Sequence, residues 1–150
     1  MVQAPGPIDT VPLLRIERDR PIPSAGQILV RISCCGVCRT DLHLAEGALR
    51  PRRPQITPGH EIVGTVEACG PGADRFRPGD RVGIPWLGRT DGVCRYCRRG
   101  DENLCESASF TGWNVDGGYA DACVADEGFA YALSDLAHGR VGGAAVLQNS

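Results

Sequence analysis

The sequence lacks the features by which membrane, secreted and nucleic-acid-binding proteins are usually recognised. No apolar run approaches the ~20 residues that a membrane-spanning helix needs, and the opening MVQAPGPIDTV has neither the charged start nor the apolar stretch of a signal peptide. The formal net charge is −2 and the 16 basic residues are spread along the chain, so no basic footprint for nucleic acid stands out. We therefore expect a cytoplasmic protein that binds neither membrane nor nucleic acid.

A dinucleotide-binding fingerprint is missing as well. The only glycines two positions apart are Gly70 and Gly72, and position 75 is an arginine, so the 150 residues contain no G-x-G-x-x-G. The sequence also has no internal repeat and no low-complexity stretch, and its length suits one compact domain with a real core.

Glycine and proline, by contrast, are abundant, with 20 and 11 residues respectively. Glycine permits left-handed turns, and proline blocks helix interiors and central strands, so long helices are not expected. Short β-like runs separated by turn signals favour a mostly β domain, a barrel or sandwich rather than a parallel βαβ sheet. The expected strands are 11–17, 27–34, 60–69, 80–86 and 118–125, and the one expected helix is 40–47.

Strand alternation assigns faces in two of these segments. In 60–69, Gly64 stands where a side chain would obstruct. The helix is expected to begin with Thr40 or Asp41 as its N-cap and to end at Gly47. The residues expected on a common side are Ile28, Val30, Ile32 and Cys34 in the first segment and Ile62, Val66 and Ala68 in the second.

Eight cysteines without a secretion signal favour metal or thiol chemistry over disulfides. The segment TDGVCRYCRRGDENLC holds Cys94, Cys97 and Cys105 as C-x2-C-x7-C, in which a tight loop presents two thiolates to one ion and a third returns after a polar excursion. Asp91, three residues before Cys94, offers a carboxylate as a fourth ligand. Four protein ligands would form a closed, structural zinc site, and the alternative is a reduced cysteine-rich loop.

A second set of ligand types is split between two segments, GVCRTDLH and PGHEIVG. Cys38 lies 22 residues before His60, which is followed directly by Glu61. One thiolate, one imidazole and a nearby carboxylate are typical of a catalytic zinc, which uses fewer protein ligands and keeps a position open. The alternatives are a polar turn around Cys38 and a hydrogen-bonded histidine at a strand edge.

Taken together, five motifs resemble one family. GVCRTDLH, GHEIVGTVEACG, GDRVGIPW, CRYCRRGDENLC and DGGYAD occur in the order and at the separations found in zinc-dependent alcohol dehydrogenases of the medium-chain dehydrogenase/reductase family, over residues 8 to 133. WLGRTDGVCRYC and FTGWNVDGGYA look most similar to the bacterial propanol-preferring branch. The resemblance implies a GroES-like, partly open antiparallel barrel with short helices and a zinc-binding loop.

The resemblance also implies roles around a catalytic zinc. By similarity Cys38 and His60 are ligands, and Glu61 lies beside the metal and can approach it during ligand exchange. The ion would act as a Lewis acid on an alcohol oxygen. Thr40 resembles the hydroxyl that starts a proton relay and His43 its outer imidazole, which agrees with their i, i+3 spacing on one helix face.

Four further positions match the family. Arg39 resembles a partner of the coenzyme pyrophosphate and Asp41 a carboxylate that orients a ligand imidazole. Trp86 resembles an aromatic wall of the substrate pocket, and Leu49 stands where some relatives have a second aromatic, which would admit longer primary alcohols. Trp86 as plain core and Arg39 as a solvated charge are the alternatives. Four cysteines match no ligand position and are expected to be small buried side chains: Cys34, Cys35, Cys69 and Cys123.

The sequence departs from the family pattern in three ways. Asp91 replaces the usual first cysteine of the structural quartet. The stretch LSDLAHGRVGGAAVLQNS contains no cysteine, although relatives place another catalytic ligand in this region, so the fourth ligand of the catalytic zinc is undefined. Because the 150 residues contain no G-x-G-x-x-G, no Rossmann domain is expected within them. We therefore expect a catalytic domain at 1–133, a divergent tail at 134–150, and truncation before the coenzyme domain.

Two functional hypotheses follow. The first is the catalytic domain of an NAD-dependent zinc alcohol dehydrogenase that interconverts primary alcohols and aldehydes, with homo-oligomers expected from the family. The second is a catalytically silent zinc-binding β module. Because hydride transfer needs the nicotinamide held against the substrate carbon, the 150 residues alone are expected to fold around zinc but to turn over little. The preferred alcohol and the choice of NAD or NADP stay open.

Overall fold

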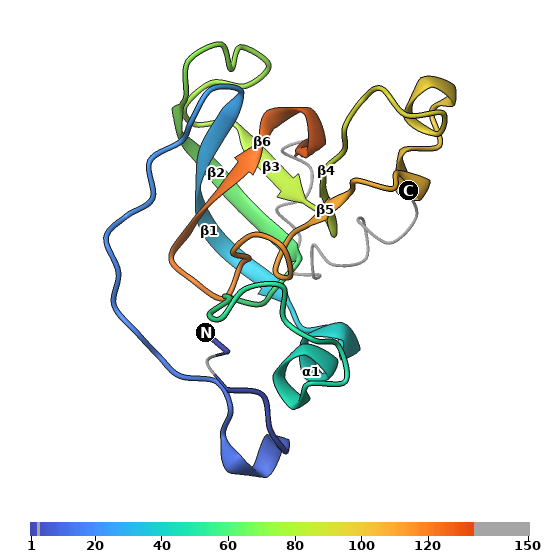
Figure 1. Cartoon of the computed structure of the whole chain (residues 1–150). Coiled ribbons are helices and arrows are strands. Elements are labelled where there is room, and N and C mark those ends of the chain that lie inside the picture. The colour runs from blue at the N-terminus through green and yellow to red at the C-terminus, as the bar shows by residue number, and fades with distance from the viewer. Residues whose placement is uncertain (3, 134–150) are drawn as a thin grey trace.

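The computed structural model describes residues 1–2 and 4–133 of the chain. Its centre is a five-stranded antiparallel sheet in the order β6-β1-β2-β3-β7, and β4 and β5 form a separate two-stranded sheet (Figure 1). The strands are β1 (Gln27–Gly36), β2 (Glu61–Cys69), β3 (Arg81–Ile84), β4 (Leu87–Arg89), β5 (Ser109–Phe110), β6 (Ala122–Asp126) and β7 (Tyr131–Ala132). The helices are α1 (Arg39–Glu46) and the 3-10 turns η1 (Ile8–Thr10), η2 (Cys97–Arg99), η3 (Glu102–Leu104) and η4 (Glu127–Phe129).

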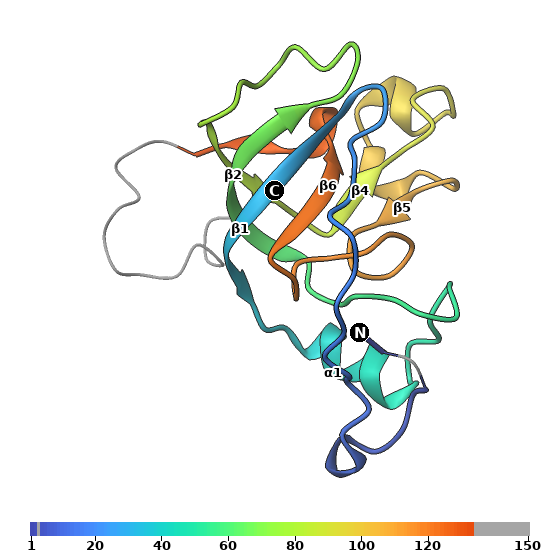
Figure 2. The ribbon, with the colours of Figure 1, turned by 90° about the vertical axis from the view of Figure 1, so that its left-hand side faces the viewer.

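The five-stranded sheet is curved and does not close, since β6 and β7 are both edges. This confirms the expected mostly β, partly open antiparallel architecture. Figure 2 shows α1 below the sheet and the two-stranded β4-β5 sheet on its flank, beside the loop that carries η2 and η3. No helix in the described part of the chain is long and apolar enough to cross a bilayer.

Apolar side chains at alternating positions of β1, β2 and β3, with residues from the segments around them, form the main core. Burying each of the larger ones contributes roughly 2 kcal/mol relative to exposure. The buried set is Ile28, Val30, Ile62, Val66, Phe76, Val82, Ile84, Cys123 and Ala130.

Close contact between β1 and β2 explains a glycine in the middle of a strand. A Cβ at Gly64 would lie 2.5 Å from the Arg31 carbonyl oxygen and 2.5 Å from Val30 Cγ1. The prediction that a side chain would obstruct at this position is therefore confirmed. The predicted common face of β1 is only partly correct, because register shifts at Leu29/Val30 and Ile32/Cys34 interrupt the alternation.

The predicted strand at 11–17 is wrong. Val11 is left-handed with φ 53°, and among the described residues the segment pairs only through an isolated bridge between Leu13 and Val2. It continues along the outside of the sheet to the start of β1 (Figure 1). Pro12, Pro21 and Pro23 each lack the N–H that a strand ladder needs, which favours an unpaired path.

The predicted helix is correct in place but not in its cap. Cys38, in an extended conformation, is the N-cap residue of α1, so Thr40 and Asp41 lie inside the first turn. Gly47 ends the helix in the left-handed conformation with φ 89°, as expected. One face of α1 packs into a second small apolar cluster, which consists of Val2, Leu44, Ala45 and Ile56.

Candidate metal centres

Sheet register brings Cys38 and His60 to the same end of the molecule. In the β1–β2 pairing Gly36, the last residue of β1, lies opposite Glu61, the first residue of β2. Cys38 follows β1 by two residues and His60 precedes β2 by one. An antiparallel pair places the end of one strand beside the start of the next, so the two segments leave the sheet side by side.

The side chains of Cys38, His60 and Glu61 converge. One ligand-type atom from each lies within 4.8 Å of the corresponding atoms of the other two. His60 is only 7% exposed, which is unusual for a side chain that can carry charge and indicates a defined set of partners. We call Cys38, His60 and Glu61 the buried centre.

Asp41 links His60 to the backbone of the segments that carry both ligand-type side chains. Its Oδ1 accepts the Gly59 N–H at 3.0 Å and lies 3.5 Å from His60 Nδ1, and its Oδ2 accepts the Cys38 N–H at 2.9 Å. The last contact is the reach-back half of a capping box. An imidazole whose Nδ1 faces a carboxylate presents Nε2 to a ligand, as in carboxylate–histidine–metal sites.

Burial and pairing act in opposite directions on this carboxylate–imidazole pair. Burial lowers the pKa of His60, but the Asp41 carboxylate and, to a smaller extent, Cys38 together outweigh it, so the net pKa is raised above its usual value. Burial likewise raises the pKa of Asp41, but contacts with His60 and the Cys38 and Gly59 amides outweigh it and the net pKa is lowered. The pair therefore favours the ionised carboxylate beside a basic imidazole.

The first turn of α1 supplies the neighbouring polar groups. The backbone N–H of Thr40 lowers the pKa of the Cys38 thiol, and Thr40 Oγ1 lies 3.7 Å from Cys38 Sγ. Arg39 and His43 are exposed on the same short helix. Thr40 thus lies beside the buried centre, and His43, one turn later, faces solvent.

Three aromatic rings continue from His60 toward the surface. The ring of Trp86 meets His60 edge-on at 4.8 Å between centroids, and stacks on Phe110 at 4.9 Å and on Trp113 at 5.9 Å. Leu49 and Trp113 each pack against the small apolar cluster to which α1 contributes Leu44 and Ala45. Trp86 is therefore next to the buried centre.

The four ligand types of the cysteine loop also come together. One ligand-type atom from each of Asp91, Cys94, Cys97 and Cys105 lies within 4.8 Å of the others, and the Cys94 and Cys97 sulfurs are 3.5 Å apart. Asp91 Oδ1 accepts the backbone N–H groups of Val93 and Cys94, each at 2.9 Å, which leaves Oδ2 available. We call these four residues the loop centre.

Ionisation within the loop centre is uneven. The backbone N–H groups of Cys94 and Val93 hold the pKa of the Asp91 carboxyl well below its usual range. The backbone N–H of Cys97 lowers the pKa of the Cys94 thiol, whereas desolvation raises the pKa of Cys97 to about 11. Neighbouring thiols cannot both ionise easily without a cation between them, so this donor set suits a positive ion.

The remaining cysteines are unpaired thiols, and of the four predicted to be buried only Cys123 is fully so, whereas Cys35 and Cys69 are half-buried. Cys123 is 4% exposed and Cys35 and Cys69 pack against the core, but Cys34 is exposed, because the β1 register shift turns it outward. Burial raises the pKa of Cys35 to about 11 and that of Cys123 to about 12. These buried thiols therefore stay protonated.

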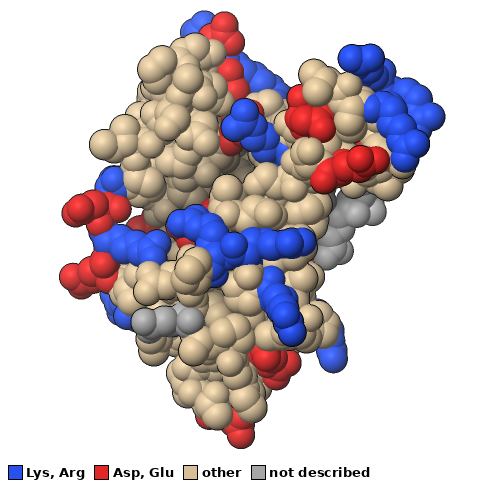
Figure 3. All heavy atoms as spheres, in the orientation of Figure 1, with Lys and Arg blue, Asp and Glu red and all other residues tan. Residues whose placement is uncertain are grey.

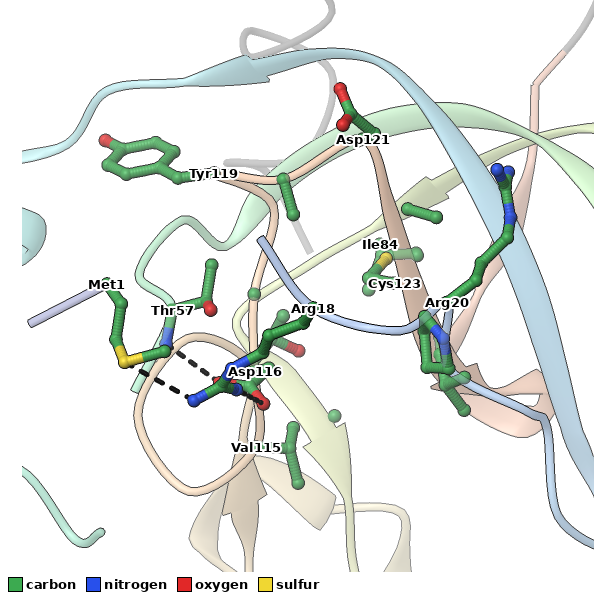
Figure 4. Close-up of a pocket in the computed structure, with 18 of the residues that line it drawn as sticks. Met1, Arg18, Arg20, Thr57, Ile84, Val115, Asp116, Tyr119, Asp121 and Cys123 are labelled. Atoms are coloured by element: carbon green, nitrogen blue, oxygen red, sulfur yellow. Dashed lines mark hydrogen bonds and ion pairs between the residues drawn. The ribbon is translucent and has the colours of Figure 1, made fainter. Parts of the chain in front are cut away.

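A cavity of about 1060 Å³ lies elsewhere, between residues 14–21 and β6. None of its described lining residues belongs to either centre. Figure 4 shows Arg18 and Asp116 paired within it, while Tyr119 stands at its end with the hydroxyl directed away from the other labelled side chains. Figure 3 shows basic and acidic groups mixed over the face in view, with arginines gathered where the cysteine loop projects. The ligand-type residues of both centres thus lie outside this cavity.

Sequence reasoning missed the role of the segment 117–119. Gly117, Gly118 and Tyr119 donate their backbone N–H groups to the carbonyls of Thr57, Gly59 and Pro58 at 2.7, 2.8 and 3.0 Å. A Cβ at Gly117 would lie 2.0 Å from the Gly59 oxygen. The motif DGGYAD contains this segment, and its paired glycines were the available signal of close backbone contact.

Comparison with known proteins gives a consistent family. The model of the alcohol dehydrogenase GroES-like domain matches residues 24–135. A Mycobacterium tuberculosis protein described as "Probable alcohol dehydrogenase AdhA" is 50% identical over 137 residues, which cover 88% of this chain and 40% of that protein. An alcohol dehydrogenase of Geobacillus stearothermophilus is 48% identical over 126 residues, 83% of this chain and 37% of the relative.

A solved structure agrees. The cobalt- and zinc-bound thermostable alcohol dehydrogenase of Pyrobaculum aerophilum superimposes with a TM-score of 0.81 at 31% identity, over 89% of this chain and 40% of that one. The chain thus spans about 40% of the length of the Mycobacterium tuberculosis and Pyrobaculum aerophilum proteins.

Proposed function

Because the chain belongs to the family of alcohol dehydrogenase GroES-like domains, we propose that it is the catalytic domain of a zinc-dependent alcohol dehydrogenase. The reaction is the interconversion of primary alcohols and aldehydes, with NAD as hydride acceptor or donor. The domain corresponds to residues 1–133; the expected tail at 134–150 lies outside the described residues, as does His138, to which no role is assigned.

The observation that supports this proposal is the convergence of Cys38, His60 and Glu61, with Asp41 behind the imidazole. A thiol with a lowered pKa, a buried imidazole and a carboxylate form a donor set that fits zinc, a borderline-soft ion bound by sulfur, nitrogen and oxygen. Three candidate ligands leave room for a substrate, whereas the loop centre offers four. We assign a catalytic zinc to the former and a structural zinc to the latter.

When bound at the buried centre, zinc supplies Lewis-acid polarisation that lowers the pKa of an alcohol oxygen and favours departure of hydride from its carbon. The chain's own residues do the remaining work. Thr40, at 3.7 Å from the Cys38 sulfur, is placed to accept the alcohol proton, and exposed His43 on the next turn is placed to pass it to solvent.

Substrate and coenzyme contacts follow from the surroundings of the buried centre. Trp86 offers an apolar wall next to His60, and Leu49, rather than a second aromatic, leaves room for longer primary alcohols. Arg39, exposed at the start of α1, is available to a coenzyme pyrophosphate. The 150 residues contain no G-x-G-x-x-G, so we assign the rest of the coenzyme site to a region outside them. A cytoplasmic homo-oligomer completes the proposal.

Metal analysis and cobalt spectroscopy test this function without relying on turnover. We expect two zinc ions per chain. After replacement of zinc by cobalt, the visible absorption of the buried centre should change when a primary alcohol is added, because that centre has an open position. The loop-centre absorption should not change. Cys38→Ser should remove the alcohol-sensitive band, and Cys34→Ser, at an exposed thiol outside both centres, should not.

One metal per chain, or a cobalt spectrum indifferent to alcohols, would leave a silent zinc-binding module as the better description. Sustained NADH production by the 150-residue chain alone would instead show that hydride transfer needs no further domain.

A further inference from the structure

The hydroxyl of Tyr119 is buried without a hydrogen-bond partner at bonding distance among the described residues. A buried hydroxyl without a partner destabilises the folded state, and native structures rarely leave one unsatisfied. Tyr119 has been assigned neither a metal ligand's role nor a contact with substrate or coenzyme, so its buried, unpaired hydroxyl needs an explanation.

Backbone contacts fix the Tyr119 ring against the loop that carries His60. The Tyr119 N–H donates to Pro58 O at 3.0 Å, and a Cβ at Gly59 would lie 2.8 Å from Tyr119 Cδ1. The ring therefore lies directly over the Gly59 backbone, one residue before His60. The same Gly59 donates its N–H to Asp41 Oδ1 at 3.0 Å, which places the Asp41 carboxylate at the edge of this contact.

Asp41 is also the charged group that acts most strongly on the tyrosine. Burial raises the pKa of the Tyr119 hydroxyl, and the negative charge of Asp41 raises it further, ahead of smaller contributions from Cys35 and Cys38. Tyr119 thus remains a protonated donor next to an ionised acceptor.

The acceptor has room for this donor. Asp41 Oδ1 already faces the Gly59 N–H and His60 Nδ1, whereas Oδ2 accepts only the Cys38 N–H at 2.9 Å. A carboxylate offers about four lone-pair positions, so one is left. The 3.5 Å separation of His60 Nδ1 from Oδ1 is long, so the orientation of the imidazole depends on what else holds the carboxylate.

We propose that the Tyr119 hydroxyl donates a hydrogen bond to the Asp41 carboxylate, directly or through one bridging water, and so fixes the acceptor that orients His60. Tyr119 is then a positioning residue of the buried centre. The Tyr119–Asp41 contact stands independently of the function proposed above, whereas its effect on metal binding rests on that function.

The variant Tyr119→Phe removes the hydroxyl and keeps the ring. Its matched control is Tyr131→Phe, because Tyr131 is 45% exposed on β7. By chelator competition we expect Tyr119→Phe to bind zinc at the buried centre roughly 10–100-fold more weakly, the range seen when groups behind a metal ligand are removed. Zinc at the loop centre should keep its affinity, and the control should change neither centre. An unchanged affinity at the buried centre would overturn the positioning role.

A double-mutant cycle in the metal-free chain tests the contact itself. Tyr119→Phe should lower the midpoint of thermal unfolding in the wild-type background, and should lower it less in the Asp41→Asn background. The side-chain amide of Asp41→Asn is an uncharged and therefore weaker acceptor, and its NH₂ group must also face one of the two backbone N–H donors, from Gly59 or Cys38. Equal effects in both backgrounds would refute the contact. If the cycle shows coupling but the wild-type chain binds no metal at Cys38 and His60, the proposed function fails and the Tyr119–Asp41 contact stands. If zinc binds at Cys38 and His60 but the two substitutions are additive, the contact fails and the proposed function stands.

Discussion

The two candidate metal centres are built in opposite ways. The loop centre takes all its ligands from one short segment, Asp91 to Cys105, on an exposed loop whose backbone hydrogen bonds are largely within itself. The buried centre takes Cys38 from the end of β1 and His60 from the start of β2, and both depend on sheet register. A local motif can thus form a metal centre by its spacing, whereas a centre with an open position needs the whole sheet to place its ligands.

Removing one thiolate from each centre should give the largest effects and should keep the centres apart. Cys38→Ser deletes the only thiolate of the buried centre, and Cys105→Ser deletes one of three in the loop centre. We expect each variant to lose zinc at its own centre alone, with affinity reduced on the order of 100-fold or more. Metal content and chelator competition measure this. Loss of both metals in either variant would show that the two centres are coupled.

Crowding the backbone behind His60 should produce the next largest effect. The added Cβ of Gly117→Ala would lie 2.0 Å from Gly59 O and 2.8 Å from Pro58 O, atoms that cannot move without displacing the loop that carries His60. We expect a loss of about 3 kcal/mol in the free energy of unfolding, together with weaker zinc binding at the buried centre only. Urea denaturation and metal titration measure the two effects.

Gly128→Ala is the matched control, since its Cβ would meet only the end of the flexible Asp126 side chain, at 3.2 Å. If Gly117→Ala weakened the loop centre as much as the buried one, the claim that close packing of 117–119 supports His60 specifically would be wrong.

The smallest expected effect is a pH dependence confined to the buried centre. His60 has a raised pKa, so its stabilisation is complete below about pH 6.5 and is lost as the pH rises through the folded-state pKa. Asp41 has a lowered pKa, so its stabilisation is present above about pH 4 and is lost as the pH falls through the folded-state value. In metal-free chain the pair therefore stabilises most between about pH 4 and 6.5.

Urea unfolding of wild type and His60→Gln, with chelator present, measures this contribution. The difference in free energy between the two should be larger at pH 5.5 than at pH 8. The loop centre contains no imidazole, so Cys105→Ser should show no such increase toward pH 5.5. A wild-type advantage that grew toward pH 8 would contradict the sign assigned to His60.

Sequence patterns predicted the sheet better than its connections. β2 and β3 were found because alternating apolar residues and flanking turn residues depend on neighbours in the chain, and Gly64 marked the close approach of β1. The segment 11–17 has an apolar pattern but no partner strand, and only the fold decides which segments pair. Cys34 was misplaced for the same reason, because a register shift in β1 changes which face a residue occupies.

In the candidate site too, local features follow from the sequence, whereas contacts between distant segments depend on the fold. The sequence by itself determined the ligand types of both centres, the order of the loop centre and the helix that carries Thr40 and His43, because spacing along a chain fixes what lies close in a turn or loop. Only the tertiary structure decided that Cys38 meets His60, that Asp41 lies behind the imidazole and that the Tyr119 ring lies over Gly59. Those contacts join segments far apart in the sequence, and they exist because sheet register and close backbone packing bring the segments together.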